Sequence, residues 1–136
     1  MAIPLIKQPV KISSAPIEIY SFSGKRVLID VYVTCYVDPK GLAVVASEAN
    51  LTTPEMYGKV STSLPESALL PDWAFFAKHW EENSVWVPSL LENSGLFEKV
   101  DIQTASGYIQ NIQAWKLKEE IVENIKSELK KRALNS

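Results

Sequence analysis

The sequence has little of the chemistry on which most metal and nucleophilic sites depend. It contains one cysteine, Cys35, and one histidine, His79, among 136 residues. A single cysteine excludes an intramolecular disulfide, which is typical of proteins in a reducing compartment. A zinc site of the common cysteine and histidine type would need carboxylates in place of most of its usual ligands. We therefore expect no metal and no cofactor.

Glycine is scarce, and neither sign of charge dominates. Five glycines lie far apart between Gly24 and Gly107, so the chain has no glycine-rich phosphate loop and no dinucleotide-binding motif. The formal net charge of −2 gives no overall attraction to nucleic acid or to an anionic membrane. The sequence therefore predicts no nucleic-acid partner and no membrane partner.

The N-terminal segment lacks a long hydrophobic run. Two prolines and two lysines interrupt residues 1–15, which contain neither the apolar core of a signal peptide nor a membrane-spanning stretch. We predict a cytoplasmic protein in which residues 1–15 form an extended arm and residues 16–136 form one domain. A chain of this length can bury a single core without disulfides.

What the first half of the chain does contain is a strong β pattern. Apolar and polar residues alternate from Arg26 onward, as expected for a strand with one buried face. The predicted buried face consists of Val27, Ile29, Val31, Val33, Cys35 and Val37. Pro39 and Gly41 favour a turn into a second strand that ends near residue 49. An earlier strand is expected over residues 16–22, and Cys35 is interpreted as a small buried hydrophobe.

Four further segments continue the strand pattern in the second half of the chain. They are residues 59–64, 73–80, 97–104 and 108–115, with Gly107 in the turn between the last two. Residues 73–80 are ambiguous, because helical spacing also places their large apolar residues on one stripe. Their aromatic density favours a strand, which is our prediction.

Two helices complete the predicted fold. Ser84 can cap a helix over residues 85–94, with Pro88 in its first turn and Gly95 ending it in a left-handed conformation. A longer amphipathic helix is predicted over residues 116–133, with acidic residues early and basic residues late. Its apolar stripe consists of Leu117, Ile121, Ile125 and Leu129. The expected class is α+β, a mainly antiparallel meander with the C-terminal helix packed on the sheet.

One short segment brings polar and aromatic side chains together. Lys78, His79, Trp80 and Asn83 supply a cation, an imidazole, an indole and an amide within six residues. We interpret these four residues as a candidate ligand-binding site and predict no catalytic residue. The simpler interpretation is that Trp80 packs in the core and Asn83 shapes a turn.

Several short motifs occur in a characteristic order between residues 26 and 117. They are Ser-Leu-Pro at 63–65, Lys-His-Trp-Glu-Glu-Asn at 78–83, Ser-Gly-Tyr at 106–108 and Trp-Lys-Leu at 115–117. Their order and spacing resemble small proteins encoded by bacterial phages, plasmids and conjugative elements. Ser63 stands where that family commonly has asparagine, and Glu82 where it commonly has serine. The resemblance implies a strand before Trp80 and a mobile-element origin, but no established activity.

We predict a non-enzymatic binding or accessory protein that occupies a host protein or a small ligand. One alternative is a small enzyme with His79 as general base, which would need a carboxylate such as Asp72 or Glu81 to orient the imidazole. Another is a self-associating module in which the C-terminal helix pairs with its copy in a homodimer.

Overall fold

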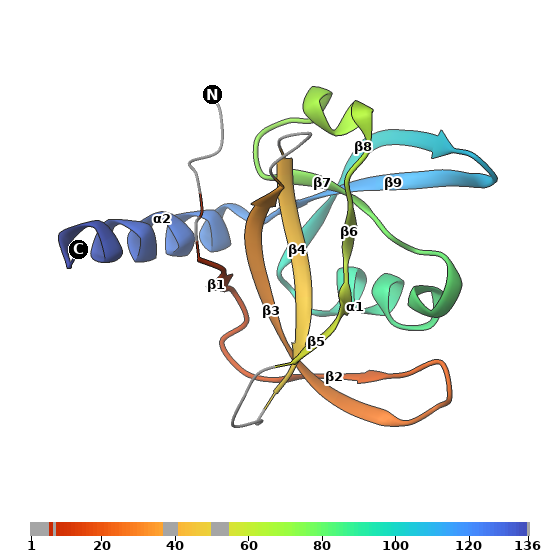
Figure 1. The fold of residues 1–136 in the computed structure, drawn as a ribbon, viewed down its shortest axis with the longest axis horizontal. Coiled ribbons are helices and arrows are strands. Elements are labelled where there is room, and N and C mark those ends of the chain that lie inside the picture. Colours follow the sequence, from red (N-terminus) through yellow and green to blue (C-terminus); the bar gives the residue numbers. More distant parts are fainter. Residues whose placement is uncertain (1–5, 7, 37–40, 50–54, 136) are drawn as a thin grey trace.

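Two antiparallel sheets and a long C-terminal helix form the protein (Figure 1). The computed structural model describes residues 6, 8–36, 41–49 and 55–135, and the turn predicted around Pro39 lies outside them. Nine strands lie within these ranges, together with two α-helices and two short 3₁₀ helices. The α+β class and the antiparallel pairing predicted from the sequence are confirmed.

The first sheet is built around one long central strand. It consists of β1 (Val10–Lys11), β2 (Ile17–Tyr20), β3 (Arg26–Tyr36), β4 (Gly41–Glu48) and β5 (Met56–Lys59). Its order is β1-β3-β4-β5, and β2 also pairs with β3. The predicted register of β3 is confirmed, since Val27, Ile29, Val31 and Val33 are all buried. Cys35 is only partly buried at the edge of the same core.

The second sheet carries the segments that form the candidate site. It consists of β6 (Ser61–Thr62), β7 (Ala74–Ala77), β8 (Phe97–Ser106) and β9 (Ile109–Leu117), in the order β6-β7-β9-β8. The strand prediction for the aromatic segment is confirmed by β7. Its spacing is ambiguous because both of its faces are buried: Phe75 packs in the main core and Phe76 in a second cluster. That second cluster also contains Leu64, Ile112 and Ala114.

Val60 joins the two sheets. Its N–H donates to the carbonyl of Val44 in β4 over 2.9 Å, and its own carbonyl accepts from the N–H of Lys78 over 2.8 Å. The chain therefore pairs with the first sheet before Val60 and with the second sheet after it. As a result, both sheets bury side chains in one main core, and the segment after β7 is held against the end of β5.

The N-terminal segment contributes to the first sheet. Val10 pairs with Val33 of β3, and Ile6 is buried in the main core. Asp30 lies on the face of β3 predicted to be polar, yet it is buried, because Lys11 and Ser13 of this segment cover it. The sheet therefore begins ahead of residue 16, inside the segment predicted to be an extended arm.

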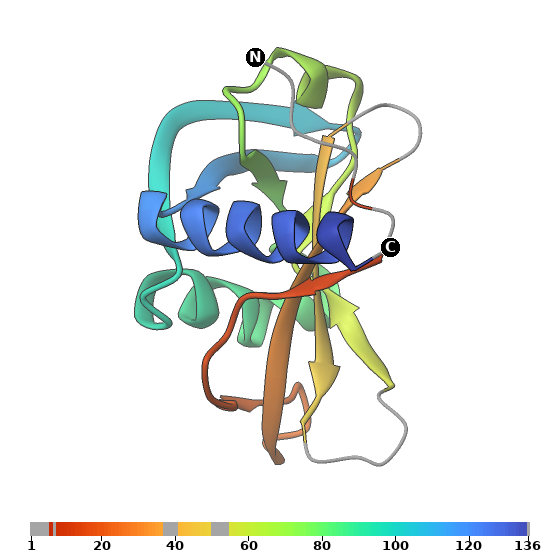
Figure 2. The same ribbon diagram turned by 90° about the vertical axis from the view of Figure 1, so that its left-hand side faces the viewer.

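Helix α2 (Glu119–Leu134) runs across one side of the first sheet, as Figure 2 shows. Ile121, Val122 and Ile125 are buried in the main core, and Leu129 packs at its margin. The prediction of a C-terminal amphipathic helix is confirmed, but its start is shifted, because Leu117 is the last residue of β9.

The helical segment before β8 differs in detail from its prediction. The chain forms a 3₁₀ helix, η2 (Glu81–Val85), and then α1 (Val87–Asn93); another 3₁₀ helix, η1 (Pro65–Leu69), follows β6. Ser84 does not cap α1, because its hydroxyl donates to the carbonyl of Glu81 over 2.8 Å within η2. Pro88 lies in the first turn of α1 and Gly95 has a φ of 79°, both as predicted.

Candidate functional site

A groove of about 290 Å³ lies between α1 and the second sheet. Its walls are formed by Ala77, His79, Pro88, Leu91, Glu92, Lys99, Asn111, Gln113 and Trp115. Helix α1 has seven residues and is about 10 Å long, whereas the nine residues of β9 extend about 30 Å. The helix therefore covers only part of the sheet face, which leaves room for the groove beside it.

The structure places the four predicted site residues on different surfaces. His79 continues the face of Ala77 and lines the groove. Trp80 points to the opposite face, where it packs against the second cluster, and it is not among the groove residues. This separation follows from the alternation of side chains along an extended chain.

Asn83 and Lys78 are connected through the backbone. The side-chain Nδ2 of Asn83 donates to the carbonyl of Lys59 over 2.6 Å and to the carbonyl of Lys78 over 3.1 Å. The amide therefore holds η2 against the ends of β5 and β7. Asn83 supports the segment that carries His79 and does not line the groove.

His79 is partly buried, and its imidazole has few polar interactions with its neighbours. Its Nε2 is buried and has no hydrogen-bond partner among the described residues. Its ring meets that of Trp80 edge to face, with the centroids 5.5 Å apart. None of the carboxylates in the described ranges forms a hydrogen bond or an ion pair with His79. The imidazole is thus not oriented as a general base normally is.

Asn111 enters the groove from an irregular point of β9. Thr104 pairs with Ile112 and Ser106 with Ile109, so β9 has one extra residue in this interval. Such a bulge redirects the side chains next to it. Asn111 has a φ of 55°, a left-handed conformation that asparagine tolerates better than most residues.

Gln113 is fully engaged inside the sheet. Its Nε2 lies within hydrogen-bond distance of the carbonyls of Val100, Ile102 and Ala114, which share its two hydrogens, and its Oε1 accepts from the amide of Gln103. These bonds fill the interval where the pairing of β8 with β9 is shifted. Gln113 is therefore a rigid part of the wall.

Two opposite charges line the groove from two different elements. Glu92 comes from α1 and Lys99 from β8, and neither has an ion-pair partner within the described parts of the chain. By contrast, the neighbouring Glu98 pairs with Lys116 over 3.3 Å. Lys99 pairs in register with Trp115, whose indole is partly buried against the main core. The groove thus combines free charges with an aromatic wall.

Sequence reasoning found His79 but missed the other polar residues of the groove. Glu92, Lys99 and Asn111 belong to three different elements, so no local motif connects them. The one local signal is Asn111 itself, since asparagine is unusual inside a strand and marks irregular pairing.

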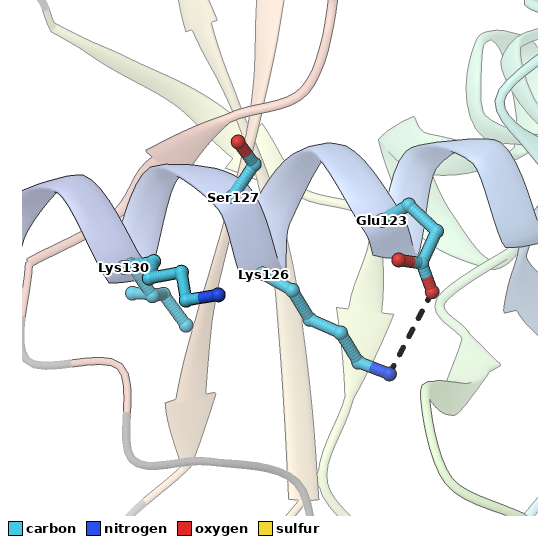
Figure 3. A pocket seen from close by; sticks show the side chains of 5 residues that line it. Glu123, Lys126, Ser127 and Lys130 are labelled. Carbon is cyan, nitrogen blue, oxygen red and sulfur yellow. Dashed lines mark ion pairs between the residues drawn. The ribbon is translucent and has the colours of Figure 1, made fainter.

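A second hollow, of about 640 Å³, lies along α2. The described residues that line it all come from this helix: Glu123, Lys126, Ser127, Leu129 and Lys130. Figure 3 shows the Glu123 carboxylate and the Lys126 ammonium facing each other, 3.8 Å apart. Charges spaced three residues apart on one helix are typical of a solvated helix surface, so we assign no site here.

Two further features are absent from the part of the chain that the structure describes. Across residues 6, 8–36, 41–49 and 55–135, no three potential metal ligands of the histidine, cysteine and carboxylate type cluster together. None of the helices within those ranges combines the length and the apolar character needed to cross a bilayer. No protein-family model matches this chain, and neither a curated protein nor a solved structure shows significant similarity to it.

Proposed function

We propose that this protein acts by binding, as an accessory factor that holds a small ligand or a segment of a host protein in the groove between α1 and the second sheet. The proposal includes a cytoplasmic location and the mobile-element origin implied by the resemblance in the sequence. Catalysis has no part in it.

The observation that carries the proposal is the composition of the groove. Ligand sites are concave and mostly apolar, with a few polar groups that fix the orientation of the ligand. Trp115, Leu91 and Pro88 supply the apolar surface. Glu92, Lys99 and Asn111 supply exposed polar groups, whose side chains form no hydrogen bond or ion pair with another described residue.

The enzyme alternative is less well supported. A general base must reach its proton and is usually oriented by a third group. His79 shares the groove with Glu92, but no hydrogen bond joins their side chains among the described residues. His79 is therefore assigned to the wall of the groove, next to the ligand.

The four tryptophans provide the test. The chain carries Trp73, Trp80, Trp86 and Trp115, so four indole N–H signals can be followed by NMR during a fragment screen. We expect groove ligands to shift the signal of Trp115 and to leave that of Trp86 unchanged, because Trp86 is buried away from the groove.

Substitution of the same residues completes the experiment. We expect Trp115→Ala to weaken binding by about 2 kcal/mol or more, as for a central aromatic anchor. Trp80→Ala, on the opposite face, is the matched control and should retain affinity if the variant is folded. A ligand that shifts Trp80 and not Trp115 would contradict the proposal. Turnover of a bound compound that His79→Ala abolishes would favour the enzyme.

A further inference from the structure

We infer that the groove takes a zwitterionic ligand with an apolar body, an apolar amino acid or a short peptide, whose carboxylate faces Lys99 and whose protonated amine faces Glu92. This inference rests on the proposed function, because it names the ligand class of the same groove.

The two charges of the groove favour a ligand that carries both signs of charge. Glu92 and Lys99 stand on different walls, and no ion pair joins them to each other. A purely anionic ligand would pair with Lys99 but would meet the like charge of Glu92, and a purely cationic ligand would meet the reverse. A ligand that carries both charges satisfies both walls at once.

The surroundings of Lys99 leave its positive charge without a partner from the neighbouring strand residues. Glu98, the adjacent acid on β8, is already paired with Lys116. Trp115, the cross-strand neighbour of Lys99, offers an indole and no negative charge. Lys99 thus has no acidic partner among the described residues, and its ammonium is available to a carboxylate from outside the protein.

The apolar wall and the size of the groove define the rest of the ligand. Trp115, Leu91 and Pro88 line the same groove with apolar surface. The volume of about 290 Å³ is just below the range of about 300–1,000 Å³ that is usual for ligand pockets, so the ligand must be small. Asn111 adds a donor and an acceptor, the same pair that a peptide group presents. An amino acid or a short peptide matches this combination.

A series of probes that share the leucine side chain and differ in their charged groups tests the inference. The probes are L-leucine and the dipeptide leucyl-leucine, compared with N-acetyl-leucine (anionic), leucinamide (cationic) and N-acetyl-leucinamide (neutral). Calorimetry gives the affinities, and the Trp115 indole signal reports the location. We expect the best zwitterion to bind about tenfold more tightly than either singly charged analogue, since each charged contact is lost in turn. The affinity of leucine compared with that of leucyl-leucine shows whether the groove prefers a free amino acid or a peptide.

Substitutions that neutralise Glu92 and Lys99 one at a time identify which charge of the ligand each residue contacts. Glu92→Gln should abolish the higher affinity of leucine relative to N-acetyl-leucine. Lys99→Gln should abolish the higher affinity of leucine relative to leucinamide. The matched controls are Glu66→Gln on η1 and Lys131→Gln on α2, both exposed and outside the groove, which should change neither ratio.

The other outcomes distinguish a wrong ligand class from a wrong binding site. If the neutral analogue binds in the groove as well as the zwitterions do, the inference is wrong while the proposed function stands. If no member of the series shifts Trp115, the inference is also wrong, and the fragment screen decides on the proposed function independently. A zwitterion that binds but shifts the NMR signals of residues outside the groove also overturns the inference.

Discussion

The side-chain amide of Asn83 lies 2.6 Å from the backbone carbonyl of Lys59, and it donates a second hydrogen bond to the carbonyl of Lys78. Lys59 ends the last strand of the first sheet, and Lys78 follows β7 of the second. One side chain therefore joins both sheets to the start of the helical segment. Because His79 follows Lys78 directly, the position of one groove residue depends on this connection.

Asn83→Ala should lower the free energy of unfolding by about 1–3 kcal/mol, since two backbone carbonyls lose their side-chain donor. Urea denaturation measures the change. Asn124→Ala, at an exposed position of α2, is the matched control and should leave the stability unchanged or slightly raised, because alanine is the better helix former. An equally stable Asn83→Ala variant would show that water replaces the amide without cost.

Gly58→Ala is predicted to destabilise the protein because of a specific steric contact. A Cβ at this position would lie 2.9 Å from Cζ2 of Trp86, whose buried ring also packs edge to face on Tyr57. Overpacking of this kind typically costs about 1–3 kcal/mol. Without the contact, the substitution would stabilise by about 0.4–1 kcal/mol through the unfolded chain. The sign of the change in urea midpoint therefore decides whether Trp86 is fixed against β5.

Much of the fold was predictable because it depends on local periodicity. The alternation in β3 identified its core residues, which are Val27, Ile29, Val31 and Val33, and the four-residue repeat identified α2. The burial of Asp30 was not predictable in this way, because its cover comes from Lys11 and Ser13, which approach only after β1 pairs with β3. Ser84 illustrates the same limit, since its hydroxyl could serve either a cap or a 3₁₀ turn.

The candidate site was predictable only in part. His79 stands out in the sequence because it is the single histidine, and its place in the groove follows from the strand that precedes it. The same alternation sends Trp80 to the other face, a consequence that the sequence already contained. Glu92, Lys99 and Asn111 meet only through tertiary packing, so no spacing rule could have joined them.

The C-terminal helix provides a test of the self-association alternative. Ile125 is 1% exposed within a single chain, so its side chain is already covered by the main core. We predict that Ile125→Ala lowers the free energy of unfolding by about 2–5 kcal/mol, as for other large-to-small core substitutions, and does not alter the molecular mass in solution. Leu134→Ala is the control, because Leu134 is 82% exposed. A change from dimer to monomer at unchanged melting temperature would instead identify α2 as an interface.

Tyr57 should make stability depend on alkaline pH. Burial, followed by the negative charges of Glu48 and Glu82, raises the pKa of Tyr57 above its ordinary value of 10.0. The folded protein therefore holds the phenol proton more tightly than the unfolded chain does. The resulting contribution to stability is complete below the unfolded pKa and is lost as the pH rises through the folded pKa.

Relative to wild type, Tyr57→Phe should gain stability as the pH rises beyond about 10, because phenylalanine has no proton to lose. Urea midpoints measured for both proteins across this range give the difference, with Tyr108→Phe, at a fully exposed position, as the control. Parallel curves for wild type and Tyr57→Phe would show that the phenol of Tyr57 ionises as easily in the folded protein as in the unfolded chain.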